Sequence, residues 1–308
     1  SGLAFAASQD SYELPEPYII WEKGYVKEFP GLQGLMDVMT ANSNAMLKNP
    51  NQDILHNRVC AAIASKMALD RNASPELRKL GPATDILHNI AKDNKELVLS
   101  KPEVLERVTE LVAELKKAGK FQKSPEFFTD IEVLKLPAVA NNLGLIHHLT
   151  GAVLRKAGGF TDDEIRTIQT AILAHSTGYW YFRDSVDKAA GKEGAWKSVY
   201  PQPESDIDNF AHDADLISQF VPESVTPDGA KWRVLAKKRW GATTPQEEGH
   251  VVYYVFSRLY DEAKTDDGRQ MAREKWDIIK PELIKLMGLK EGQDPIQVLG
   301  VPKYWQKK

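Results

Sequence analysis

The chain has 308 residues, of which 42% are hydrophobic and 27% are charged, and its formal net charge is -3. These values are ordinary for a globular protein, and they give no basic surface for nucleic acid and no acidic tail. The single cysteine, Cys60, excludes an internal disulfide framework and any cysteine-rich zinc module. No apolar run approaches the roughly 20 residues that a membrane-spanning helix needs.

The N-terminal segment is rich in proline, tyrosine and glutamate without a helical or strand period, so we expect an irregular arm over residues 1–30. The letters "AFA" followed by Ala7 resemble the small-residue end of a signal peptide, although no charged or long apolar region precedes them. Two interpretations follow for the compartment. One is a cloning remnant before a floppy terminus of a cytoplasmic protein, and the other is a periplasmic protein with a trimmed leader.

Helical spacing of apolar residues begins at Gly31. A first helix is expected up to Met46, before the "NPNQD" break, and a second helix follows with Asp53 as a plausible N-cap. One face of this second helix carries residues at steps of three and four: His56, Val59, Cys60, Ile63 and Met67. A third helix is expected after Pro75 or Pro82, and it carries His88.

The remainder of the chain also favours helices. The stretch "KPEVLERVTELVAELKKAGK" is amphipathic, opened by Pro102 and closed by Gly119. Further helices are expected near 137–157, 161–177, 205–220, 245–264 and 267–287. The alternation that makes strands is nearly absent, and no repeat or long linker is visible. We therefore predict an all-α protein with one helical domain over 31–290 and a C-terminal tail over 291–308.

Histidines give the sequence its clearest functional pattern. There are seven of them: His56, His88, His147, His148, His175, His212 and His250. A single histidine on an apolar helical face is usually a structural core residue. Here four such histidines fall on separate helices, imidazole is the commonest metal ligand, and a helical bundle brings inward-facing side chains together. This pattern indicates a metal site.

The order of these residues resembles a known family. The letters "ILHNIAK" resemble the "hxHDhGK" core of the HD-domain metal-dependent phosphohydrolase superfamily, which is all-helical. The segment "HHLTGAVL" resembles the "HxxxGA" segment of its two-metal members, which selects His147 over His148. The resemblance covers about half of the chain and implies an HD-domain-like helical bundle with additional peripheral helices. The implied ligand positions are His56, His88, Asn89, His147, His175 and Asp215.

Asn89 is the departure from the family pattern, since the family has an aspartate there that bridges two metal ions. An amide oxygen can coordinate a cation, but it brings no charge. The resemblance implies one or two divalent ions of iron, manganese, nickel or magnesium. One ion could bind to His56, His88 and Asp215. Two could bind if Asp85, Asp93 or Asp213 compensates, or the site could have become a binding pocket without metal.

Two charged side chains are candidates for contacting a substrate. Lys92 matches the lysine of the family motif and could meet a phosphate group, or it could be a solvated surface residue. Arg183 lies in "STGYWYFRDS", which could form an anion-binding substrate wall or a structural group of core aromatics. A structural role is expected for His212 and His250, and His148 could support a ligand from behind.

The resemblance favours a metal-dependent hydrolase of a phosphate ester or nucleotide, acting on an anionic small molecule through a metal-activated water. A first alternative is an HD-type di-iron oxygenase, as typified by myo-inositol oxygenase, acting on a small hydroxylated or phosphonate substrate. A second alternative is a non-catalytic binding protein with a degenerate site. The oligomeric state stays open.

Overall fold

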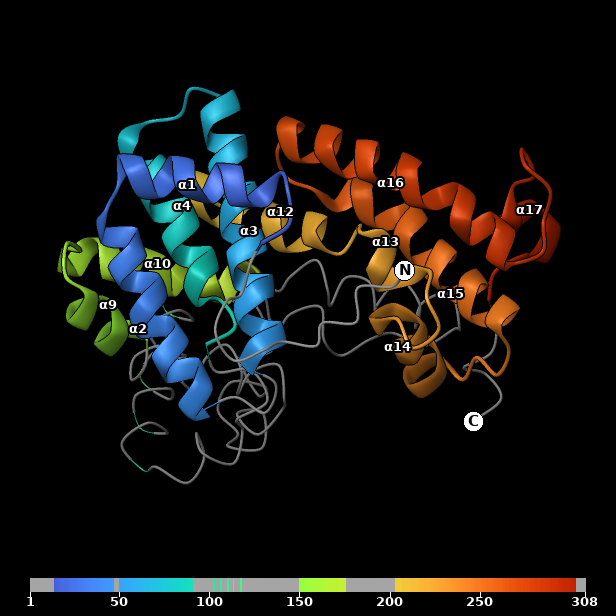
Figure 1. Ribbon diagram of the computed structural model, residues 1–308, viewed down its shortest axis with the longest axis horizontal. Helices are drawn as coiled ribbons and strands as arrows, with labels where there is room; N and C mark the ends of the chain where they lie inside the picture. Colours follow the sequence, from blue (N-terminus) through green and yellow to red (C-terminus); the bar gives the residue numbers. More distant parts are fainter. Residues whose placement is uncertain are drawn as a thin grey trace. The chain divides into compact units, whose positions relative to one another are not determined.

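The computed structural model describes residues 14–46, 50–90, 150–175 and 203–302, with five separate positions between 102 and 117. Every regular element in these ranges is a helix, so the predicted all-α class is confirmed (Figure 1). The helices are α1 (Tyr18–Glu28), α2 (Gly31–Met46), α3 (Pro50–Asp70), α4 (Pro75–Leu87), α9 (Gly151–Ala157), α10 (Asp162–His175), α12 (Asp206–Ser218), α13 (Pro222–Val225), α14 (Lys231–Trp240), α15 (Pro245–Leu259), the 3-10 helix η3 (Tyr260–Glu262), α16 (Asp266–Leu286) and α17 (Pro295–Leu299). Within the described residues, none of these helices is long and apolar enough to cross a membrane.

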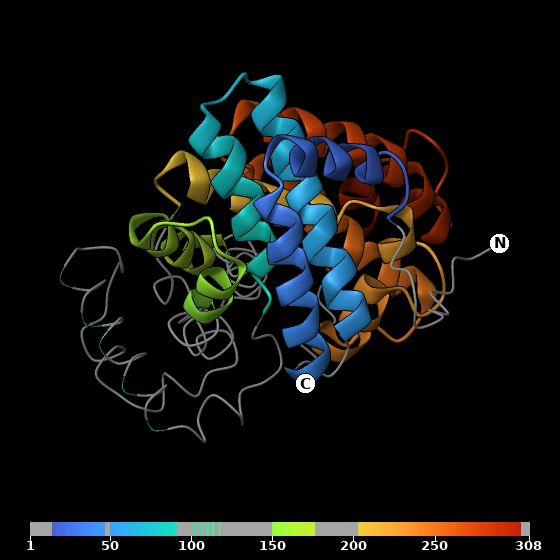
Figure 2. The same ribbon diagram turned by 60° about the vertical axis from the view of Figure 1, so that its left-hand side comes forward.

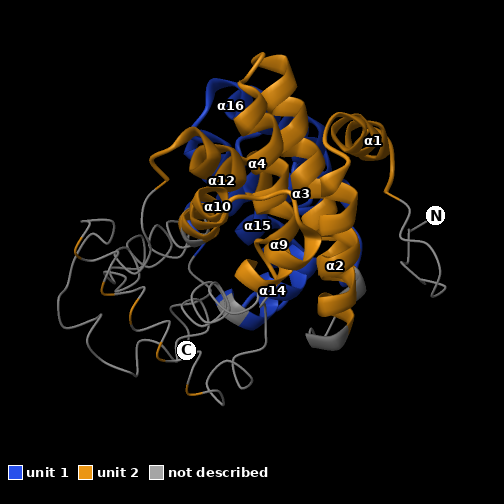
Figure 3. Ribbon diagram, turned by 90° about the vertical axis from the view of Figure 1, so that its left-hand side faces the viewer, with its two compact units in different colours: residues 1–6, 178–196, 216–308 blue, residues 7–177, 197–215 orange. Residues whose placement is uncertain are grey.

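The described residues fall into two compact units, coloured separately in Figure 3. The N-terminal unit holds α1 to α10 and the first part of α12, up to Asp215, and the C-terminal unit begins at Leu216. The boundary therefore falls inside a continuous helix. The single domain predicted over 31–290 stays a prediction, because two compact units can belong to one folding domain.

The N-terminal unit is built around α3, which contacts α1, α2 and α4 (Figures 1 and 2). Every residue from Cys60 to Ala64 on this helix is buried. Three of them are alanines, and their small side chains let neighbouring helices approach closely. Gly81 of α4 uses this space, since a Cβ placed there would lie 4.0 Å from the Cβ of Ala64. The helix that carries His56 is thus held firmly on several sides.

Helix α4 has clear start and stop signals. The Ser74 hydroxyl accepts a hydrogen bond from the backbone N–H of Leu77 at 3.2 Å, and Pro75 occupies the first turn, where its missing N–H costs nothing. Pro82 lies within the helix. The helix ends at Leu87, so His88 is its C-cap residue and projects from the last turn. The "LHN" sequence is therefore displayed at a helix terminus.

The expected irregular N-terminal arm was wrong for residues 18–28, which form α1. Tyr18, Glu22 and Tyr25 recur at helical spacing and are buried, a polar-aromatic stripe that a search for aliphatic periodicity overlooks. The Arg58 Nε atom of α3 donates to the Glu22 carboxylate at 2.8 Å, which anchors this helix. The expected C-terminal tail likewise contains the short helix α17.

The longest helix of the C-terminal unit that sequence periodicity misses is α14. Its sequence, KWRVLAKKRW, is too basic to show an apolar stripe. Its Arg233 side chain is nevertheless only 3% exposed, and its Nε atom lies 2.7 Å from a carboxylate oxygen of Glu248 on α15. Lys237 pairs with the other oxygen of Glu248 at 3.0 Å, and the Thr226 carbonyl accepts from Arg233 at 2.8 Å. The buried Arg233–Glu248 ion pair adds to the apolar packing of Trp232, Ala236 and Trp240 on this helix.

Candidate metal centre

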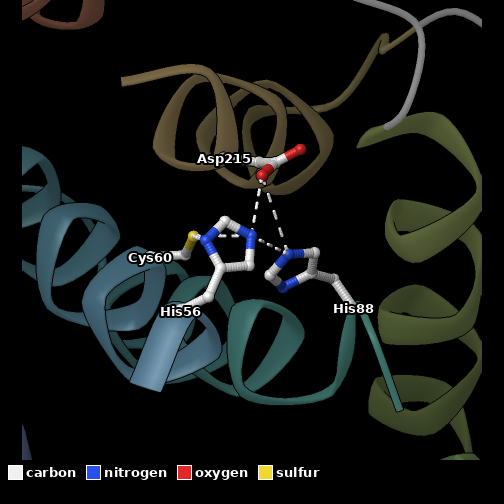
Figure 4. A group of neighbouring side chains, drawn as sticks. All are labelled: His56, Cys60, His88 and Asp215. Carbon is white, nitrogen blue, oxygen red and sulfur yellow. Dashed lines mark hydrogen bonds and ion pairs between the residues drawn. The ribbon is translucent and has the colours of Figure 1, made fainter. Parts of the chain in front are cut away.

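Three helices of the N-terminal unit bring their polar side chains to one point (Figure 4). His56 comes from α3, His88 from the end of α4, and Asp215 from α12. The Nε2 atom of His56 lies 3.2 Å from Nε2 of His88 and 3.0 Å from Oδ1 of Asp215. The distance from His88 Nε2 to the same oxygen is 3.8 Å. Two donors at about 2.1 Å from one cation lie roughly 3.0–3.4 Å apart, a range that includes the two distances from His56 and is shorter than the distance from His88 to Asp215.

The tautomer of His88 is set by the end of its helix. The last carbonyls of an α-helix lack intrahelical partners, and Nδ1 of His88 donates to one of them, the Asp85 carbonyl, at 2.6 Å. In the neutral ring, Nε2 therefore carries a lone pair, and this is the atom that faces His56 and Asp215. Burial and the charges of His175 and His56 lower the pKa of His88 well below its ordinary value, against the opposing effect of Asp215. The ring is thus neutral and ready to coordinate.

His175 repeats this arrangement at the end of α10. Its Nδ1 atom donates to the Ile172 carbonyl, three residues earlier. Its ring centroid lies 4.8 Å from that of His88, with the rings close to perpendicular at 75°. Burial lowers the pKa of His175 as well, opposed by the charge of Asp215. Two helices therefore deliver neutral imidazoles to the same region by the same device.

Asp215 is the negative group among these rings. Burial by itself would raise the pKa of its carboxyl group, but the hydrogen bond from His56 and the charges of His56, His88 and His175 hold this pKa well below the usual range. The carboxylate consequently stays ionised at neutral pH. An ionised carboxylate beside neutral imidazoles is the donor set that borderline divalent cations take in proteins.

Asn89 lies directly beside this group. Its side-chain amide donates to Nε2 of His88 at 2.7 Å. A cation on Nε2 would displace this hydrogen bond, and half a turn of the amide would present its oxygen instead. Asn89, the residue that departs from the family motif, therefore contacts Nε2 of His88, the atom that would bind the cation. It contributes no charge there.

Cys60 joins the group without having been expected there. It lies one turn after His56 on the same face of α3, and its Sγ atom is 3.8 Å from each ring nitrogen of His56. These equal distances place the sulfur against the imidazole ring of His56. The candidate metal centre is therefore defined as His56, Cys60, His88 and Asp215, whose potential ligand atoms all lie within 4.8 Å of one another. Such a cluster could hold a metal ion.

Two further acidic residues differ from Asp215 in their surroundings. Asp213 lies 2.9 Å from Nδ1 of His212, so Asp215 is the aspartate of α12 that contacts His56 and His88. The Asp85 side chain is fully buried, and within the described residues neither carboxyl oxygen has a hydrogen-bond partner. Burial and the nearby charge of Asp215 raise the pKa of Asp85 well above its ordinary value.

The other expected site residues have different outcomes. The imidazole of His250 has its Nε2 atom 2.9 Å from the Gly300 carbonyl, an arrangement that fits the structural role expected for it. Nδ1 of His212 pairs with Asp213, and its Nε2 atom is buried without a hydrogen-bond partner among the described residues, so the structural role expected for it stays a prediction. The remaining candidates lie outside the described residues: His147, His148, Lys92, Asp93 and Arg183.

An open cavity of about 730 Å³ in the C-terminal unit offers no comparable chemistry. Its lining mixes acidic and basic side chains, among them Asp277, Lys280 and Asp294. Within the described ranges, the metal-ligating side chains that come together do so at the candidate metal centre.

In comparisons with known proteins, no family model, no curated protein and no solved structure matches this chain. The resemblance to the HD-domain superfamily therefore rests on the motifs quoted above. The geometry of His56, His88 and Asp215 stands independently of it.

Proposed function

We propose that the chain is a metal-dependent hydrolase of the HD-domain type that acts on a phosphate ester or nucleotide. The observation that carries the proposal is the convergence of His56, His88 and Asp215 from three helices, with donor atoms 3.0–3.8 Å apart. The sequence order of these residues is the order of the family motifs. Two of the three distances lie in the range expected for two ligands of one divalent cation.

The protein's own groups prepare such a site in several ways. The Asp85 carbonyl fixes the His88 ring so that Nε2 faces the centre, and burial keeps this ring neutral. Asp215 stays ionised, because the hydrogen bond from His56 and the neighbouring histidines lower its pKa. His56 and Asp215 retain some exposure, with side chains 17% and 23% accessible, so a small substrate can reach the centre.

A bound divalent cation would supply Lewis acidity toward a phosphoryl oxygen and would make a water molecule more acidic. His56, His88 and Asp215 would hold it, with Asn89 in reach. Manganese, iron, nickel and magnesium are the expected metals. Lys92 and Arg183 are the expected contacts for the negative charge of the substrate.

The test begins with metal analysis of protein purified without chelator or a nickel column. Hydrolysis of p-nitrophenyl phosphate, bis-p-nitrophenyl phosphate and nucleoside mono-, di- and triphosphates is then measured with each metal. Asp215→Asn and His56→Asn should abolish turnover, and Asp163→Asn, at an exposed position of α10, should leave it unchanged.

Three results would point elsewhere. Bound iron with visible absorption and no phosphatase turnover would favour an oxygenase. Protein without metal, whose melting temperature does not respond to added Mn²⁺, Fe²⁺, Ni²⁺ or Zn²⁺, would favour a binding protein, because a cation that binds only the native state must stabilise it. Turnover that survives Asp215→Asn would place the chemistry outside this centre.

A further inference from the structure

We propose that His212 is a nitrogen ligand of a second cation subsite, on the His175 side of the candidate metal centre, and that Asp213 orients it. The inference rests on the proposed metal-dependent function. It adds a ligand that the family resemblance does not supply and that the sequence pattern had assigned to structure alone.

The first observation is the pairing of His212 with a buried carboxylate. Nδ1 of His212 lies 2.9 Å from Oδ1 of Asp213, and the two side chains are 1% and 0% exposed. With the Nδ1 proton donated to Asp213, Nε2 of the neutral ring carries a lone pair. Metal-binding histidines are typically oriented in this way, by a carboxylate on the ring nitrogen that does not face the metal.

The second observation is that this lone pair has no use in the protein itself. Nε2 of His212 is buried and has no hydrogen-bond partner among the described residues. Buried polar atoms are nearly always paired, because an unpaired one loses its hydration without compensation. The buried His250 obeys that rule, since its Nε2 atom bonds to the Gly300 carbonyl. Nε2 of His212 is therefore available to bind a cation, whereas Nε2 of His250 is already hydrogen-bonded.

The third observation is the place of His212. It lies three residues before Asp215 on α12, so the two side chains share a face of the helix. The His175 ring lies 4.8 Å from the His88 ring, and Nε2 of His88 lies 3.8 Å from Asp215, so the end of α10 and this face of α12 border the same centre. Neither His212 nor His175 belongs to the four residues whose ligand atoms lie within 4.8 Å of one another. A cation held by them would lie beside the first one.

This arrangement answers the difficulty that Asn89 creates. Two divalent cations in one pocket repel each other, and an amide between them does not offset that repulsion. Asp213 lies directly behind His212, so its negative charge is transmitted to the second subsite through the ring. Asp215 supplies negative charge to the first cation subsite.

The experiment counts Zn²⁺ bound to the metal-stripped full chain by equilibrium dialysis and isothermal titration. His212→Asn is the sharpest variant, because the asparagine amide can still donate to Asp213 while the Nε2 ligand is gone. Asp213→Asn keeps His212 but removes the carboxylate that sets its tautomer. His250→Gln is the matched control, a change at a buried imidazole that is bonded to backbone. Circular dichroism verifies that each variant is folded.

We expect two equivalents of Zn²⁺ for the unaltered chain and for His250→Gln, and one for His212→Asn. Asp213→Asn should weaken the second equivalent at least tenfold. In the unaltered chain labelled with ¹⁵N-histidine, Zn²⁺ should move the Nε2 resonance of His212 and leave that of His250 in place, which tests the inference even if a variant fails to fold. One equivalent in the unaltered chain, or an unshifted His212 resonance, overturns this inference and leaves the proposed function standing. No bound Zn²⁺ at all overturns both.

Discussion

Replacing Asn89 by aspartate tests the electrostatics of the candidate metal centre most directly. In the native chain the Asn89 amide donates to Nε2 of His88 at 2.7 Å. Asn89→Asp removes this donor and places a carboxylate oxygen against a lone pair. The change is nearly isosteric, so packing is scarcely altered. The variant therefore differs by the lost hydrogen-bond donor and by the negative charge of the new carboxylate.

The sign of the effect depends on metal. Without a cation, His88 loses a hydrogen bond in a buried position, which costs about 1–3 kcal/mol of unfolding free energy. This corresponds to a melting temperature lower by roughly 2–8 °C for a chain of this size. The carboxylate also favours the protonated ring, so it raises the pKa of His88. With a cation on Nε2, the same carboxylate becomes a ligand, and we expect at least tenfold tighter binding, about 1.4 kcal/mol.

The assay is thermal melting and metal titration of both forms at pH 8, with and without excess Mn²⁺ or Fe²⁺. Asn89→Ala is the control that removes the donor without adding charge, so it should be destabilised without metal and should bind metal no more tightly than the unaltered chain. Asn42→Asp makes the same chemical change on α2, where the amide donates to the Val38 carbonyl. If Asn89→Asp binds metal and melts like the unaltered chain under every condition, the assignment of Asn89 to the centre is wrong.

Three shorter predictions follow. Folding lowers the pKa values of His88 and His175, so the metal-free native state binds fewer protons than the unfolded chain just below pH 6.5. The free energy of unfolding should therefore fall as the pH is lowered there, by up to about 1.4 kcal/mol per pH unit for each ring, as measured by urea unfolding. Asp215→Asn should abolish the stabilisation by Mn²⁺ or Zn²⁺, which at a hundredfold excess over Kd is about 2.7 kcal/mol in the unaltered chain; an undiminished response would contradict the ligand assignment. Glu248→Ala should cost about 3–5 kcal/mol by leaving Arg233 buried without its main partner, whereas the double change with Arg233→Met should cost clearly less than the sum of the two single changes. A double loss equal to that sum would show that the pair contributes no coupling.

The sequence predicts the helical class because the helical spacing of apolar residues agrees with the positions of helix-starting and helix-ending residues along most of the chain. It also predicts that His56, His88 and Asp215 belong together, since their order matches a family pattern. Helix α14 escapes prediction because its buried side chains include Arg233 as well as Trp232 and Trp240, and the Glu248 partner that lets Arg233 be buried lies on another helix. Helix α1 escapes for a related reason, since Glu22 is buried only because Arg58 meets it.

The additional groups around the centre show the same limit. Cys60 and His212 each lie on the face of a helix that carries a predicted ligand, at a spacing of four and three residues, so the signal was present in the sequence. Periodicity alone cannot separate a core residue from a ligand on that face. The distinction lies in which hydrogen bonds each side chain makes, and those depend on the neighbouring helices.

The burial of Cys60 has a practical consequence. It is the single cysteine of the chain, it is fully buried, and it lies against the His56 ring. A thiol reagent can therefore modify the native protein only when the helices around α3 open transiently, and every labelled molecule reports that same opening. The labelling rate then converts into a free energy of local opening, as hydrogen exchange does for a backbone amide. The chain thus carries its own kinetic probe of how firmly the centre is closed, and no engineered label is needed to read it.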